Sequence, residues 1–161
     1  MCPPKDMTMV KSRKKIRLPR SEYGDPQGVY FITICAQRSG VPFGTDLSRE
    51  IVDCLLELKL QKGFSLYCYC LMRDHLHLAI SPPPDGPDVM EIVQHLKDAT
   101  TRKTWCGARR ARLWQRSFYD HIARRKEDVA AICEYIINNP VRAGLVQSHE
   151  QYPFCGLVDP V

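Results

Sequence analysis

Long apolar runs and closely paired cysteines are both missing from this sequence. No apolar run approaches the roughly 20 residues of a membrane-spanning helix, and no secretory apolar segment follows the basic residues 1–20. The eight cysteines contain no C-x-x-C pair, and several lie in apolar periodic stretches, where thiols behave as small hydrophobic side chains. We therefore expect a cytoplasmic protein without a membrane partner, whose cysteines are reduced and mostly buried.

Internal repeats and low-complexity linkers are missing as well, so one domain accounts for the chain. Its 161 residues are enough to bury a core without crosslinks, and 44% hydrophobic with 25% charged residues is typical of a globular protein. We expect a basic N-terminal arm at 1–20, a folded domain at 21–146, and a short, irregular C-terminal tail at 147–161.

Positive charge is unevenly distributed along the chain. The net charge is +5, and basic residues gather in KSRKKIRLPR at 11–20, TRKTWCGARRAR at 101–112 and ARRK at 123–126. Such clusters predict a polyanionic partner, nucleic acid first, although they also fit a solvated basic surface. The residues that we expect to contact a DNA backbone are Arg13, Lys14, Lys15, Arg17, Arg20, Arg109, Arg110, Arg112, Arg124 and Arg125.

Apolar periodicity and turn residues predict four strands and three helices. In chain order these are strand 28–37, helix 46–62, strands 64–72 and 75–83, a helix from Asp88, strand 112–123 and helix 126–139. This order predicts an α+β fold of the ferredoxin-like or RRM-like type. Four antiparallel strands would form the sheet, two helices would cover one face, and the C-terminal helix would remain for the other.

Two histidines, His75 and His77, stand one residue apart in the predicted strand 75–83. Side chains alternate between the faces of a strand, so both imidazoles lie on one face while Leu76 and Leu78 lie on the other. Imidazole is a common ligand of divalent metal ions, yet two ligands make a weak site, and the same spacing fits two surface histidines. A third ligand would have to come from another element.

The predicted helix 126–139 carries further polar groups beside its apolar stripe. Tyr135 and Asn139 lie one turn apart on the same flank of that stripe. If this flank lies over the histidine face, Asn139 can add an oxygen to the metal, and the Tyr135 hydroxyl points at whatever the metal holds. Alternatively, Tyr135 is a tyrosine of the hydrophobic core whose hydroxyl lies at the edge of that core.

Several segments together resemble a known family. In order and spacing, RKKIRLPRSEYGDPQGVYFITICAQR, PFG, CLMRDHLHLAI, LWQRSFYDHIARRKED and YIINNPVRAGLV are similar to the REP-associated tyrosine transposases, which belong to the single-tyrosine transposases of the HUH nuclease superfamily. The resemblance covers about residues 13–146. Its most specific parts are the histidine strand and the block that opens at Tyr135.

The resemblance implies a function for these residues. His75 and His77 would bind a divalent metal ion, Mg²⁺ or Mn²⁺, with Asn139 at the position from which relatives supply a third ligand. Tyr135 would be the nucleophile that cleaves and rejoins single-stranded DNA beside a hairpin or palindromic repeat, through a 5′-phosphotyrosine. The enzyme would act as a monomer or a homodimer.

The chain departs from this family before the first histidine. Relatives commonly have Pro-Asn there, and this chain has Arg73-Asp74, which bears on the geometry of the turn and on the charge near the metal. Strand alternation points Asp74 away from the histidine face. The aromatic residues that we consider as platforms for stacking DNA bases are Tyr119, Phe118 and Trp114.

Two other functions fit parts of the pattern. A non-catalytic single-stranded nucleic-acid-binding module would use the same RRM-like sheet, with aromatic and basic residues on its open face. A structural zinc site would combine Cys68 and Cys70 with His75 and His77, because both pairs have alternate-residue spacing.

Overall fold

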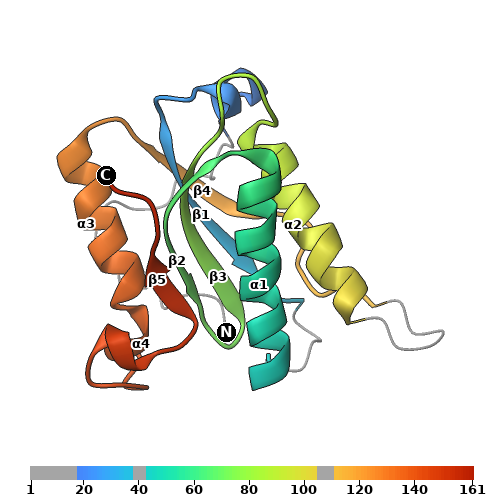
Figure 1. Ribbon diagram of the computed structural model, residues 1–161, viewed down its shortest axis with the longest axis vertical. Helices are drawn as coiled ribbons and strands as arrows, with labels where there is room; N and C mark the ends of the chain where they lie inside the picture. The colour runs from blue at the N-terminus through green and yellow to red at the C-terminus, as the bar shows by residue number, and fades with distance from the viewer. Residues whose placement is uncertain (1–17, 38–42, 105–110) are drawn as a thin grey trace, which may run out of the picture.

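The computed structural model describes residues 18–37, 43–104 and 111–161 of the chain. Within them the elements follow one another in an α+β order (Figure 1). They are η1 (Arg20–Gly24), β1 (Val29–Cys35), α1 (Thr45–Lys62), β2 (Ser65–Leu71), β3 (His75–Ser81), α2 (Val89–Lys103), β4 (Tyr119–Ala123), α3 (Lys126–Ile137), α4 (Asn139–Arg142), η2 (His149–Gln151) and β5 (Cys155–Leu157).

The strands of the described residues form one antiparallel sheet in the order β4-β1-β3-β2-β5. The first four strands have the order of a split β-α-β fold, so the predicted ferredoxin-like arrangement is confirmed. β3 lies at the centre, where its neighbours β1 and β2 satisfy both of its edges. The histidine strand is therefore held in the sheet on both sides.

One face of the sheet packs against α1 and α2, which lie side by side in Figure 1. The helices bury their apolar stripes against a core that includes Leu76, Leu78 and Ile80 of β3. Helix boundaries follow the predicted signals: α1 ends before Gly63, whose φ of 69° is left-handed, and Asp88 forms a capping box with Glu91 at the start of α2. None of the helices in the described ranges is both long and apolar enough to span a bilayer.

The opposite face of the sheet is covered by α3, so the molecule has three layers (Figure 1). α3 buries Val129, Cys133 and Ile136 against small side chains of the sheet, among them Cys68 and Ala79. The predicted apolar stripe of this helix is thus confirmed. Because the leucines of β3 face α1 and α2, its histidines face the layer that contains α3.

The start of β4 and the end of α3 differ from the predicted boundaries. β4 begins at Tyr119 rather than near residue 112, because the carbonyls of residues 115–117 accept hydrogen bonds from the buried Lys97 ammonium, at 3.0, 3.2 and 3.2 Å. Those three carbonyls therefore bind a side chain of α2. α3 ends at Ile137, and the buried Pro140 lies within the separate turn α4 instead of directly stopping the longer helix.

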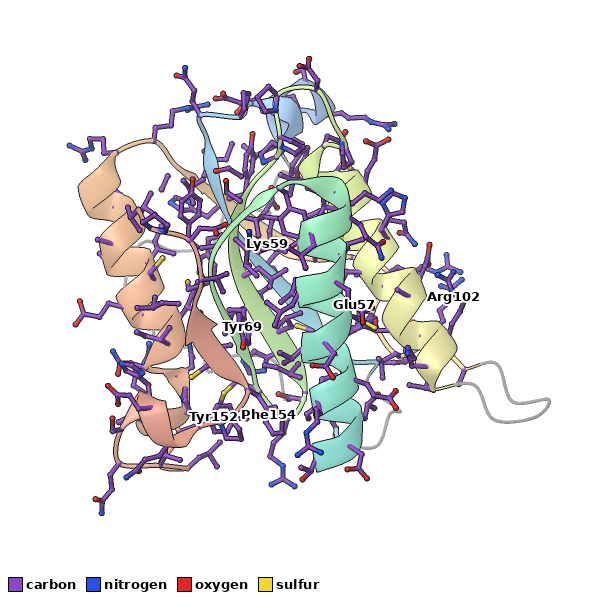
Figure 2. The ribbon with its side chains drawn as sticks, in the orientation of Figure 1. Glu57, Lys59, Tyr69, Arg102, Tyr152 and Phe154 are labelled. Carbon is purple, nitrogen blue, oxygen red and sulfur yellow. The ribbon has the colours of Figure 1, made fainter. Side chains whose placement is uncertain are left out.

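The expectation of an irregular C-terminal tail is wrong, because the tail contains a strand. Its strand β5 pairs with β2 and extends the sheet to five strands within the described residues. The Tyr152 hydroxyl donates to the Leu71 carbonyl at 2.9 Å, and the Asp159 carboxylate accepts from the Leu66 amide at 2.8 Å. Figure 2 shows Tyr152 beside β5. The tail thus covers the edge of β2.

Candidate functional site

The two histidines of β3 lie next to each other on the α3 side of the sheet. Their ring centroids are 4.7 Å apart, and the rings meet nearly edge to face. His77 is buried, with 4% of its surface exposed, whereas His75 is partly exposed near the end of the strand. The alternation of the strand therefore brings both imidazoles to one place, as predicted.

Each imidazole has a hydrogen-bond partner for Nδ1. His77 Nδ1 lies 2.8 Å from Thr33 Oγ1 on the neighbouring strand β1, and His75 Nδ1 lies 2.6 Å from the carboxylate of Asp74. When each Nδ1 donates its proton to these oxygens, Nε2 keeps its lone pair for a metal ion. A hydrogen-bond acceptor behind the second ring nitrogen of each histidine is the usual outer shell of a metal site. Asp74 thus contacts His75 although strand alternation alone points it away.

His77 remains neutral over a wide pH range. Burial lowers its pKa to about 3, and the neighbouring His75 and Arg142 shift the pKa in the same direction. A metal ion requires the neutral form of imidazole. His77 is therefore in the correct protonation state at neutral pH without any partner that removes a proton.

Tyr135 lies in the last turn of α3 and reaches the same region as His77. Both rings contact Phe31 of β1, with centroid distances of 5.5 Å for His77 and 6.3 Å for Tyr135. Tyr135 is partly exposed, and its hydroxyl accepts a hydrogen bond from the exposed Arg142 at 3.2 Å. The tyrosine is therefore neither enclosed in the core nor remote from the imidazoles.

Asn139 lies one turn after Tyr135, at the start of α4. Its amide nitrogen donates to the carbonyls of Tyr135 and Ile136, both at 3.0 Å, and so satisfies two backbone groups at the end of α3. This leaves the amide oxygen Oδ1 as the atom that suits a divalent metal ion. The hydrogen bonds of Asn139 join it to α3 and not to either histidine.

The donor set suits a weakly held oxygen-binding or nitrogen-binding metal ion better than structural zinc. Within residues 18–37, 43–104 and 111–161, no three His, Cys, Asp or Glu side chains are placed to hold a metal ion together. The structural zinc site of Cys68, Cys70, His75 and His77 is therefore wrong. The thiols make other contacts instead: Cys70 donates to Met72, and Cys68 meets Cys133 of α3. Imidazole nitrogens and an amide oxygen are both ligand types that a divalent transition-metal ion such as Mn²⁺ accepts, whereas structural zinc sites usually hold four His or Cys ligands.

The cysteines of the described residues are free, as expected for reduced thiols. Five are buried and Cys155 is half-buried. Contact with Cys133 and burial raise the pKa of the Cys68 thiol, which keeps it protonated. These thiols therefore act as small apolar side chains between α3 and the sheet.

The predicted DNA-binding residues fall into two groups. Outside the described residues are Arg13, Lys14, Lys15, Arg17, Arg109 and Arg110. The other four are exposed, namely Arg20, Arg112, Arg124 and Arg125. Of these, Arg124 pairs with Glu22 of η1 at 3.6 Å and Arg125 with Asp128 at 3.2 Å, both at the surface.

Two of the three predicted stacking residues are buried. Trp114 is 3% and Phe118 8% exposed, and both belong to the core beneath α1 and α2. Trp114 also donates its indole N–H to Thr100 at 2.8 Å. These residues cannot reach a DNA base, and the prediction for them is wrong. Tyr119, at the start of β4, is 40% exposed and stays a candidate.

Sequence reasoning missed three contributors to the site. Thr33 and Phe31 lie on β1 and meet the histidines and Tyr135 only because β1 pairs with β3, with Thr33 opposite His77. Arg142 lies in the quoted block YIINNPVRAGLV, yet nothing in its spacing shows that its guanidinium stacks on Tyr135, 4.0 Å from the ring centroid. Membership of the family block could therefore have drawn attention to Arg142, although it would not have given the residue a role.

Comparison with known proteins identifies a family for this chain. Residues 28–139 match the family described as "Transposase IS200 like". A Haemophilus influenzae protein assigned as a REP-associated tyrosine transposase is 28% identical over 137 residues, covering 79% of this chain and 78% of the relative. The REP-associated tyrosine transposase of Escherichia coli is 23% identical over 127 residues, covering 79% and 74%.

The fold is also that of a solved relative. A structure of a REP-associated tyrosine transposase bound to a REP hairpin superposes with a TM-score of 0.68 at 21% identity, covering 91% of this chain and 82% of that one. The resemblance inferred from the sequence motifs is thus confirmed. Since the family match spans both histidines, the tyrosine and most of the chain, the protein belongs to the IS200-like transposase family.

Proposed function

We propose that this transposase cleaves and rejoins single-stranded DNA beside a hairpin, with Tyr135 as nucleophile. The observation that carries the proposal is the convergence of Tyr135 and His77 on the same Phe31 ring within one chain, with the tyrosine hydroxyl at the surface. A nucleophile from α3 and a pair of ligands from β3 then share one site. One protomer therefore suffices for the chemistry, whether the enzyme is a monomer or a homodimer.

The reaction follows from the chemistry of a phenol and a phosphodiester. The Tyr135 oxygen attacks phosphorus and its proton passes to solvent. The bond between phosphorus and the 3′ oxygen breaks, and the leaving 3′ oxygen takes up a proton from solvent. The products are a 5′-phosphotyrosine and a free 3′-hydroxyl. Because the number of phosphoester bonds is conserved, attack by a 3′-hydroxyl on the phosphotyrosine rejoins a strand without ATP.

His75, His77 and the Asn139 oxygen would hold a Mg²⁺ or Mn²⁺ ion for this reaction. When bound, such an ion polarises the scissile phosphate and offsets negative charge in the transition state. Asp74 and Thr33 would accept hydrogen bonds from Nδ1 of the two imidazoles and so orient Nε2 toward the ion. Asn139 also braces the end of α3, so the same residue would fix the position of the tyrosine and complete the ligand set.

The substrate class follows from the charge and from relatives. Exposed arginines such as Arg20 and Arg124 would bind phosphates, with the basic arm at 1–20 adding more. A solved relative is bound to a REP hairpin, and we propose a hairpin of a palindromic repeat as the partner here. Reaction with DNA would take place in the cytoplasm.

Trapping the covalent intermediate tests the proposal. A labelled single strand that carries an imperfect palindrome from the flanks of the reading frame is incubated with the protein and manganese, and the mixture is denatured. We expect a labelled protein band in the wild type. Chelation of the metal should remove this band, and added manganese should restore it. Tyr135→Phe should form no band but should still bind the hairpin. A non-catalytic binding module predicts instead that the wild type binds the hairpin and forms no band.

The partly buried Tyr67 provides a matched control for this test. It lies on β2, and its hydroxyl is within 3.3 Å of Ser81, away from the phosphate chemistry proposed for α3. Tyr67→Phe removes a phenolic oxygen from the same face of the sheet. We expect its adduct to form at the wild-type rate, and an equal loss in both variants would contradict a specific role for Tyr135.

A further inference from the structure

Arg142 packs against Tyr135, the residue whose hydroxyl oxygen would attack the phosphate. Its guanidinium carbon is 4.0 Å from the centroid of the Tyr135 ring, and its Nη2 donates to the hydroxyl at 3.2 Å. The stack restricts the ring and the hydrogen bond orients the oxygen. Both contacts involve atoms of the reacting residue itself.

The backbone after α3 is built to bring Arg142 to this position. Arg142 follows Tyr135 by seven residues, which in a straight helix is a rise of about 10 Å along the axis. Here α3 ends at Ile137, the buried Pro140 opens the short turn α4, and Gly144 with a φ of 70° turns the chain again. The arginine amide donates to the Asn138 carbonyl at 3.0 Å, which holds α4 in place.

Arg142 also lies in the same region as the imidazoles. Its guanidinium stacks on Tyr135, and Tyr135 and His77 both contact the ring of Phe31. A permanent positive charge there favours an anion such as the scissile phosphate. The exposed guanidinium has five N–H donors, of which the contact with Tyr135 uses one, so several remain for phosphate oxygens.

We propose that Arg142 is a catalytic residue that orients the Tyr135 oxygen and binds the scissile phosphate. This inference rests on the strand-cleavage function proposed above. In the resting site the guanidinium donates to the phenol. As the oxygen attacks phosphorus, the phenol O–H proton leaves to solvent, the bond between phosphorus and the 3′ oxygen breaks, and the 3′ oxygen takes up a proton from solvent. The guanidinium donates to the phosphate oxygens on which negative charge gathers.

The test uses single-turnover adduct formation at saturating hairpin oligonucleotide, with manganese and full-length protein. Loss of one preorganised donor costs about 100-fold or more in rate. We therefore expect Arg142→Ala to slow the adduct about 100-fold, while hairpin affinity stays within about threefold because other phosphate contacts carry it. Arg142→Lys keeps the charge without the planar fork and should recover only about tenfold.

Arg49 supplies the matched control. It is exposed on α1, a helix on the opposite side of the sheet from α3 (Figure 1), and lies outside the basic clusters. Arg49→Ala removes one positive charge and should react at the wild-type rate. Because Arg142 is exposed, its substitution should leave the thermal unfolding midpoint unchanged, and added guanidinium ion should restore part of the rate to Arg142→Ala and none to Tyr135→Phe.

The possible results separate the two proposals. A wild type that binds the hairpin and forms no adduct overturns the cleavage function and this inference with it. A wild-type adduct together with an unchanged or faster rate in Arg142→Ala overturns the role of Arg142 alone. An Arg142→Ala variant that loses only affinity, with the saturated rate intact, shows a binding arginine and also overturns the catalytic role.

Discussion

Acid should destabilise the fold through His77, by an amount that the structure sets. The side chain is 4% exposed, and its pKa falls from 6.5 to about 3 in the folded protein, chiefly because of burial. The unfolded chain therefore binds a proton between these values that the folded chain does not. The stabilising contribution is complete above about pH 6.5 and is lost as the pH falls toward about 3. At about pH 4.5, two pH units below the unfolded-state pKa of 6.5, the loss of unfolding free energy is about 2 to 3 kcal/mol.

Urea unfolding at about pH 7.5 and about pH 4.5 measures this loss. Carboxylates also titrate in the interval, so the quantity to compare is the difference between the wild type and His77→Gln. The amide of glutamine can still meet the Thr33 hydroxyl, and it does not titrate. We expect the variant to lose about 2 to 3 kcal/mol less than the wild type between the two pH values. Equal losses would refute the assignment of a buried, neutral histidine.

Three further predictions concern partners of the site and of the sheet. Thr33→Val removes the oxygen behind His77 and should weaken manganese binding, measured by calorimetry, by about 10- to 100-fold; unchanged affinity would contradict the outer-shell role. Lys97→Met leaves three backbone carbonyls without their ammonium donor and should lower the free energy of unfolding in urea by about 2 to 4 kcal/mol, whereas a change below about 1 kcal/mol would show that water replaces it. Tyr152→Phe removes the hydrogen bond from the Tyr152 hydroxyl to the Leu71 carbonyl and should lower the free energy of unfolding by about 1 kcal/mol. Amide hydrogen exchange should become faster only in β5 and at the edge of β2.

Much of the layer architecture was predictable from local signals. The apolar segments of β1 and β3, the glycine after α1 and the capping box of α2 specify their elements almost alone. Alternation along β3 also placed His75 and His77 on one face. These features depend on periods of two or 3.6 residues, which are visible in a single segment.

The rest depended on contacts between distant segments. The strand predicted over 112–123 shortened because Lys97 of α2 binds the carbonyls that a longer strand would use. β5 has three residues and no β-branched side chain, and it forms because β2 offers it an edge. Thr33 and Arg142 reached the site through strand register and through the break after α3. No periodicity in one segment reports such pairings.

Thiol size sets the gap between the two halves of this enzyme. Tyr135 and its neighbours ride on α3, the imidazoles belong to the sheet, and between them Cys133 rests on Cys68 and Ala79. A bulkier residue at 133 would increase the distance between α3 and the sheet, and so move the Tyr135 hydroxyl away from the histidines without changing the side chains of either element. A series of substitutions of increasing size at this position would show the largest separation at which strand cleavage still occurs.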